Sequence, residues 1–214
     1  MKQLLAFLTA MTLLAGVEGA VAGVTGTLKE VEIPSDMESR QRGAVMVVET
    51  CLMCHSLKYL SFKDLNNIGM TKEQIEELLN EQEMGDKMMS LTPIDDRKES
   101  YGKVPPDLSL MAIARANGPA HIYTLMTGYY YNEEDETDNH LFPGIKMPDV
   151  FGYSDTEAGS EDRAEVEAMT KDVTAFLVWA ADPNAESRRT IGFWVIVYLI
   201  ILTTLLYLLK KRTW

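Results

Sequence analysis

Cys51, Cys54 and His55 form a C-x-x-C-H run, in which two thiols and an imidazole are placed close together. Cysteines three positions apart lie on one face of a helical turn, and the histidine follows directly. This arrangement suits two thioether bonds to the vinyl groups of a haem, with the histidine as an axial ligand of the iron. The sequence has only two cysteines among its 214 residues, so the pattern is specific. It predicts one covalent haem c.

A structural or redox-active dithiol is the alternative interpretation of this motif. A C-x-x-C dithiol of that kind is expected near a βαβ pattern, and it gives His55 no role. The haem interpretation uses all three residues, and we therefore prefer it.

The sixth coordination position of such an iron needs a donor well downstream, on a loop that can reach the open haem face. Met147 fits, because a proline on either side of it restricts the backbone of its loop. A thioether ligand raises the haem potential, which suits a high-potential electron carrier. His121 and His140 are the other candidates, and we expect them to be surface or structural histidines. Met111 and Met126 lie at helical spacings typical of core residues.

An apolar segment at the start of the chain, residues 4–17, follows Lys2 and precedes small residues at an A-x-A site. This is the pattern of a secretory signal peptide, and about fourteen apolar residues are few for a membrane span. We expect a signal peptide over residues 1–22, with cleavage before Gly23, and export of the haem domain.

A second apolar segment, residues 190–209, contains twenty residues without a charge. As a helix it covers roughly 30 Å, the thickness of the hydrocarbon core of a bilayer. Two basic residues precede it and three follow, which weakly favours a cytoplasmic tail. We therefore predict a periplasmic haem domain (23–187), a single transmembrane anchor (188–211) and a cytoplasmic tail (212–214) in a bacterial inner membrane. A buried soluble helix is the alternative, but helices apolar on all sides are rare outside membranes.

The net charge of −12 is unevenly distributed along the chain. Residues 188–214 carry five basic and no acidic side chains, which leaves −17 on residues 23–187. A domain of this charge repels acidic surfaces and attracts basic ones at long range, so nucleic acid is not an expected partner. Solubility alone is the other explanation of such acidity.

Helical periodicity between the two apolar segments predicts a mainly α fold, a c-type cytochrome domain around one haem. The first expected helix begins at a capping box of Ser35 and Glu38 and runs into the haem motif, and a second begins at a capping box over residues 71–74. A third is capped by Asp107 and ended by residues 117–118. The last two span residues 120–127 and 161–181. We expect the first and last of these to cross behind the haem, with Gly43 allowing a close approach. Arg115, on the third helix, could pair with a haem propionate.

These motifs in their order resemble the cytochrome c1 family, the haem subunit of ubiquinol–cytochrome c reductase. The resemblance spans nearly all of the mature chain. It rests on residues 42–43 and 51–56, on 105–109 with Arg115, on 123–129, on 142–144 with 147–148, and on 172–181 with the anchor. This chain is compact, with little between Gly128 and Pro143.

The resemblance implies that His55 and Met147 are the axial ligands, that Arg115 is a propionate partner, and that Pro106 and Tyr129 contact the haem. It also implies electron transfer from a Rieske iron–sulfur protein to a cytochrome c, beside a cytochrome b, in a dimeric membrane complex. The chain would thus be the electron-transfer subunit of an enzyme, without substrate chemistry of its own.

Two other functions fit the same motifs. One is a membrane-tethered c-type cytochrome that feeds a terminal oxidase or reductase. The other is a haem sensor or peroxidase whose sixth iron position is open.

Overall fold

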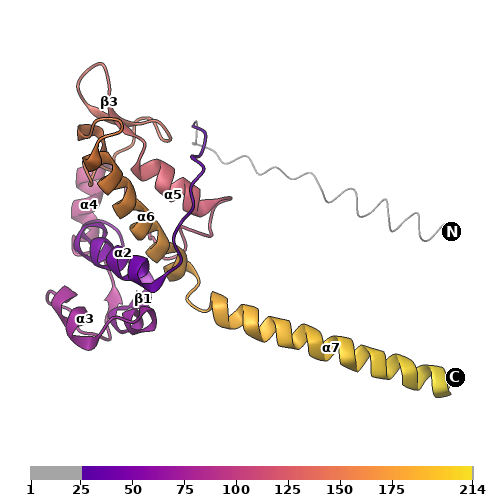
Figure 1. Ribbon diagram of the computed structural model, residues 1–214. Coiled ribbons are helices and arrows are strands. Elements are labelled where there is room, and N and C mark those ends of the chain that lie inside the picture. Colours follow the sequence, from indigo (N-terminus) through magenta and orange to yellow (C-terminus); the bar gives the residue numbers. More distant parts are fainter. Residues whose placement is uncertain (1–25, 214) are drawn as a thin grey trace.

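The computed structural model describes residues 26–213 (Figure 1). The predicted signal peptide, residues 1–22, lies outside the described residues. The helices are α2 (Met37–Glu49), α3 (Lys72–Leu78), α4 (Ile94–Tyr101), α5 (Gly118–Met126), α6 (Glu161–Ala181) and α7 (Ala185–Thr213). Short 3-10 helices occupy Cys51–Met53, Phe62–Ile68 and Tyr153–Asp155. The predicted mainly helical fold is confirmed.

Two small antiparallel sheets complete the described part of the fold. Strand β1 (Leu57–Ser61) pairs with β2 (Lys87–Met88), and β3 (Tyr129–Tyr131) pairs with β4 (Thr137–Asn139). The second pair is a hairpin in which Tyr130 lies opposite Asp138. Each sheet fixes the start or end of a loop that leads toward the haem motif or toward Met147.

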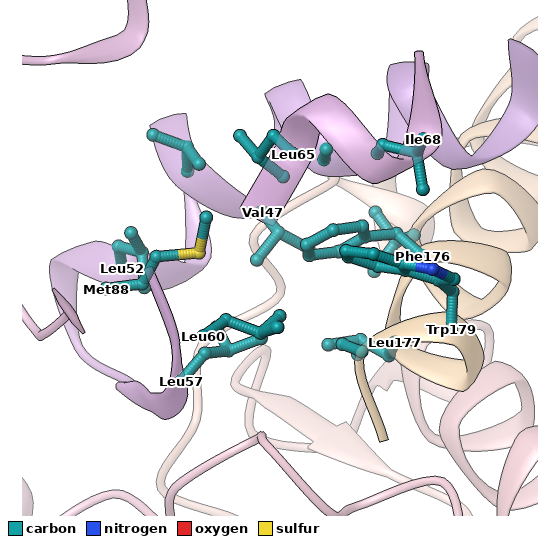
Figure 2. Close-up of a cluster of buried hydrophobic side chains, with 14 of the residues drawn as sticks. Val47, Leu52, Leu57, Leu60, Leu65, Ile68, Met88, Phe176, Leu177 and Trp179 are labelled. Carbon is teal, nitrogen blue, oxygen red and sulfur yellow. The ribbon is translucent and has the colours of Figure 1, made fainter. Parts of the chain in front are cut away.

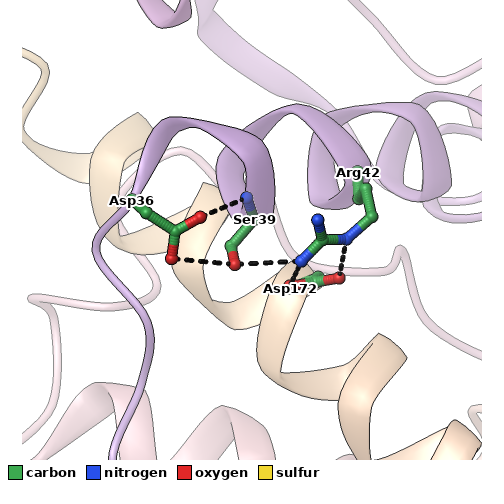
Figure 3. Close-up of polar contacts among 4 residues, drawn as sticks. All are labelled: Asp36, Ser39, Arg42 and Asp172. Atoms are coloured by element: carbon green, nitrogen blue, oxygen red, sulfur yellow. Dashed lines mark hydrogen bonds and ion pairs between the residues drawn. The ribbon is translucent and has the colours of Figure 1, made fainter.

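Helices α2 and α6 cross closely, as the position of Gly43 predicts. A Cβ atom on Gly43 would lie 2.0 Å from the main-chain oxygen of Asp172, so only glycine permits this approach. Beside the crossing, the Arg42 guanidinium pairs with the Asp172 carboxylate, with an Nε–Oδ2 distance of 2.6 Å (Figure 3). The crossing holds α2, and with it the start of the haem motif, against the last helix of the domain.

The N-terminus of α2 differs in detail from its predicted capping box. Asp36, rather than Ser35, is the cap, and its carboxylate accepts the Ser39 N–H at 2.8 Å. That hydrogen bond lowers the pKa of Asp36. Ser39 Oγ also donates to Asp36 and accepts from Arg42, so the cap is joined to the Arg42–Asp172 pair (Figure 3). A carboxylate can serve both the helix end and the neighbouring hydroxyl, which explains its use here.

The hydrophobic core lies where α2, α6 and the segment after the haem motif meet (Figure 2). Its largest fully buried members are Phe62, Phe176, Leu52, Leu57, Leu65 and Ile68. Leu52 belongs to the haem motif itself, and it is 1% exposed. The motif is therefore anchored to the core by its own side chain.

Two helix predictions around the haem motif are wrong in their boundaries. Helix α2 ends at Glu49, and Cys51–Met53 form a 3-10 turn rather than a continuation. The helix expected from Asp107 is replaced by turns, because the Asp107 carboxylate accepts main-chain N–H groups of Lys58 and Ser109. Tertiary contact with the β1 segment thus competes with helix capping.

Gly118 begins a helix instead of ending one. Asn117 precedes α5 in the left-handed conformation, with φ of 52°. A Cβ on Gly118 would lie 2.2 Å from the carbonyl oxygen of Ala112, so the turns pack tightly against the helix start.

The long helix predicted over residues 161–181 is confirmed. Helix α6 spans the predicted residues, and Ser160 caps it by accepting the Arg163 N–H. Residues 182–184 separate it from α7, which projects away from the rest of the fold (Figure 1). Within residues 26–213, α7 is the one helix long and apolar enough to cross a membrane, and none of its apolar window is buried.

Candidate haem site

One open cleft gathers most of the predicted site residues. It encloses about 1370 Å³, its mouth included. Cys51, Cys54, His55, Pro106, Arg115 and Met147 all line it. Apolar residues from α5, α6 and the connecting loops form much of the remaining wall, among them Leu108, Met111, Ile122, Met126, Val173 and Leu177. Met126 is buried and Met111 packs against the core, as expected, and both also line the cleft.

The C-x-x-C-H motif is a tight turn closed by its first residue. The carbonyl oxygen of Cys51 accepts the N–H groups of Cys54 and His55 at 3.1 and 2.8 Å. Arg97, a buried residue of α4, donates from Nη1 to the Cys54 carbonyl at 2.9 Å. The turn is therefore held from both sides, and both cysteines line the cleft.

Burial governs the thiol chemistry at this turn. It raises the pKa of the Cys51 thiol to about 12, with a further contribution from the neighbouring Cys54. Reactive redox cysteines need a stabilised thiolate, so this environment argues against the dithiol interpretation. The same apolar environment is compatible with attachment of the cysteines to a cofactor that fills the cleft.

The histidine of the motif is prepared to bind a metal through one specific nitrogen. His55 Nδ1 lies 2.7 Å from the carbonyl oxygen of Pro106. A carbonyl can only accept, so Nδ1 carries the proton and the lone pair of Nε2 is available. Burial lowers the pKa of His55 and keeps the imidazole neutral, as a metal ligand must be. Pro106 therefore acts on the site through its carbonyl, which orients the ring.

The loop that carries Met147 is fastened at several points. Asp138 Oδ1 accepts the N–H of Gly144 at 2.7 Å, where φ is +73°. Tyr129 does not line the cleft; its hydroxyl donates to the main-chain carbonyl of Met147 at 3.0 Å. Tyr129 thus contributes to the site by positioning Met147 within the loop.

Asn139 is a second tie to this loop, and it was not among the site residues predicted from the sequence. It is fully buried, and its Nδ2 donates to the carbonyl of Leu125 at the end of α5. Its Oδ1 accepts the N–H groups of Leu141 and Phe142, at 2.9 and 3.3 Å. One side chain therefore joins α5 to the start of the Met147 loop. A hairpin end followed by Phe-Pro-Gly was the available signal.

The three histidines occupy different environments. His140 is exposed and stacks on Tyr130 with ring centroids 4.0 Å apart, which agrees with a surface residue. His121 does not lie on the surface, because it lines the cleft and is only 8% exposed. No local spacing indicated this position, because Arg115 lies in the turns before α5 and His121 lies within α5.

The charges of the cleft are opposite to those of the domain. Lys103, Arg115, Lys146 and the two histidines line it, and no Asp or Glu is among its described lining residues. Although the domain has a net charge of −17, the apolar wall and basic side chains of the cleft favour a largely apolar ligand that carries negative groups. A haem has such a ring and two carboxylates, and the cysteine, imidazole and thioether donors match its attachment and ligation. The residues present therefore fit a haem c.

Comparisons with known proteins agree with this fit. The Cytochrome C1 family model matches residues 29–99 and 85–214. The chain is 31% identical to the cytochrome c1 of Rhodospirillum rubrum, over 84% of this chain and 82% of that protein. It is also 31% identical to the ammonia monooxygenase gamma subunit of Nitrosomonas europaea, over 84% of each chain. A fused cytochrome b/c1 of Bradyrhizobium diazoefficiens is 29% identical, over 84% of this chain and 33% of that protein.

Proposed function

Because the chain belongs to the cytochrome c1 family, we propose that it is the haem-bearing electron-transfer subunit of a quinol–cytochrome c reductase. The observation that carries this proposal is the convergence of Cys51, Cys54, His55 and Met147 on one basic, apolar cleft. A bound haem c supplies an iron that changes between the ferrous and ferric states and so carries one electron. This chain binds no quinol in this scheme.

Each site residue has a distinct part in this proposal. Cys51 and Cys54 would form the thioether bonds, and His55 would bind the iron through Nε2. Met147 would supply the second iron ligand, a thioether that would raise the potential. Arg115 pairs with a propionate, since its guanidinium lines the same cleft.

The partners follow from the family and from the fused relative. Cytochrome b is the expected membrane partner, and the cytochrome b/c1 of Bradyrhizobium diazoefficiens supports it because that protein bears both names. A Rieske iron–sulfur protein would donate the electron and a cytochrome c would accept it, in a complex we expect to be dimeric. Helix α7 would anchor the chain by a single pass, with the haem domain on the periplasmic side.

A second candidate complex comes from the relative in Nitrosomonas europaea, which is as similar to this chain as the cytochrome c1 of Rhodospirillum rubrum. The same haem subunit could serve an ammonia monooxygenase. Solubilising the membranes in mild detergent and identifying the proteins that co-purify separates the two. Cytochrome b and a Rieske protein would support the reductase, monooxygenase subunits would support the second complex, and a terminal oxidase would favour a tethered electron carrier.

Ligation by Met147 is tested directly by Met147→Leu. Loss of the thioether should lower the midpoint potential and open the ferrous iron to carbon monoxide, while the wild-type protein stays closed. Rapid carbon monoxide binding by the wild type would instead indicate an open sixth position, as in a sensor or peroxidase. An unchanged potential in Met147→Leu would assign the position to another residue.

A further inference from the structure

His121 has chemistry that the proposed function leaves unused. It is 92% buried, it lines the cleft, and within residues 26–213 neither ring nitrogen has a hydrogen-bond partner. The other histidines are accounted for, since His55 is bound to Pro106 and His140 is stacked at the surface. The ring nitrogens are not enclosed by protein atoms, so they face the open cleft and are available to a ligand placed there.

The surroundings of His121 identify the charge of that partner. Burial lowers the pKa of His121, and the cation of Arg115, which lines the same cleft, lowers it further. Lys103 and Lys146 add positive charge to the cleft, and Tyr101 is a neutral donor there. Arg115 itself makes no hydrogen bond or ion pair with any other described residue. Two unpartnered donors that share one wall, with no acidic side chain lining it, fit a pair of carboxylates on a ligand.

We propose that His121 is a second haem-contacting residue, which donates a hydrogen bond from its imidazole to a haem carboxylate beside Arg115 and couples the haem potential to pH. This inference rests on the proposed function in that a haem must occupy the cleft. It requires that His121 itself is not the sixth iron ligand, but it does not require that Met147 is. His121 lies in the first turn of α5, so the N-terminus of this helix would favour the same negative group.

The coupling has a definite sign. A carboxylate partner favours the imidazolium form of His121, whereas Arg115 and burial oppose it. Oxidation of the iron adds a positive charge to the same cleft, so the pKa of His121 is lower in the ferric than in the ferrous protein. By linkage, a proton on His121 raises the midpoint potential, and the potential falls as the pH rises through these two pKa values.

The experiment is a redox titration of the full-length, detergent-solubilised holoprotein between about pH 5 and 8, where histidines titrate. We expect the wild-type potential to fall with pH, with a slope approaching about 59 mV per unit, the equivalent of a tenfold change in a one-electron couple. His121→Gln should abolish most of this slope. His140→Gln is the matched control, because it removes a histidine that lies outside the cleft, and it should keep the wild-type slope.

A second variant guards against poor folding. His121→Tyr keeps a ring and a hydrogen-bond donor but does not titrate in this range, so it should give a flat profile in a protein that retains its haem. A wild-type potential independent of pH would overturn the inference, as would a slope that survives in both His121 variants. Carbon monoxide binding by His121→Gln would show that His121 is an axial ligand and would also overturn it.

Failure of this inference is distinguishable from failure of the proposed ligation. Met147→Leu should lower the potential at every pH and leave the slope unchanged. If Met147→Leu has no effect while His121→Gln removes the slope, the ligand assignment fails and the coupling stands. If the reverse is found, the coupling fails and the ligand assignment stands.

Discussion

Replacing Gly43 by alanine is the most direct test of how the fold supports the haem motif. The new Cβ would lie 2.0 Å from the carbonyl oxygen and 2.5 Å from the carbonyl carbon of Asp172. Ordinary contacts begin at 3.4 Å, so the two helices must separate by roughly 1.4 Å at this point. The atoms in the way belong to the main chain, and a side-chain rotation cannot relieve the contact.

The expected loss of stability follows from two opposing effects. Alanine favours a helix over glycine by about 1 kcal/mol. Overpacking typically costs about 1–3 kcal/mol, and here it also stretches the Arg42–Asp172 pair and opens the core around Phe176. We expect a net destabilisation of up to about 2 kcal/mol, which lowers the melting temperature of a domain of this size by up to roughly 4–8 °C.

Thermal unfolding of the solubilised holoprotein, followed by haem absorbance, measures this effect. Gly192→Ala is the matched control, because Gly192 also lies in a helix but nothing surrounds its Cβ position within 4 Å. The control should leave the unfolding of the haem domain unchanged. A Gly43→Ala protein that melts with the wild type would refute the close crossing of α2 and α6.

Three further outcomes are expected. Cys54→Ser should leave haem attached through Cys51 alone, so that normal double attachment is lost; haem that still resists acid–acetone extraction like the wild type, with two thioether bonds by mass, would contradict this assignment. Asn139→Ala removes three hydrogen bonds that fix the Met147 loop, and carbon monoxide should enter about tenfold faster or more; unchanged access would mean that the loop is held elsewhere. The exposed acids at the β3–β4 turn should make the association rate with a basic cytochrome c fall as ionic strength rises, since salt screens charges beyond about 10 Å at 0.1 M. Neutralising these acids should reduce this salt dependence in stopped-flow measurements. A wild-type rate that is independent of salt would mean that the acidity serves solubility only. These acids are Glu133, Glu134, Asp135 and Glu136.

Local signals in the sequence were sufficient where neighbouring residues settle the outcome. The haem motif places its three chemical groups within five positions, and no folding information is needed to recognise it. Helix α6 has its predicted bounds because acidic residues at its start, an apolar stripe and a proline-containing break agree with one another. The capping box of Thr71 with Gln74 and the long apolar α7 were predictable for the same reason.

Tertiary contacts decided the remaining features. Asp107 looked like a helix cap, but it bonds to Lys58 in β1, and the predicted helix gives way to turns. The Pro106 carbonyl and the Asn139 amide act on groups 14 to 51 positions away in the chain, and no spacing rule reveals such pairs. His121 belongs to the cleft only because α5 turns that face toward the haem motif. Sequence patterns report the partners of a residue within about one helical turn or strand, whereas burial and long-range hydrogen bonds depend on how the elements meet.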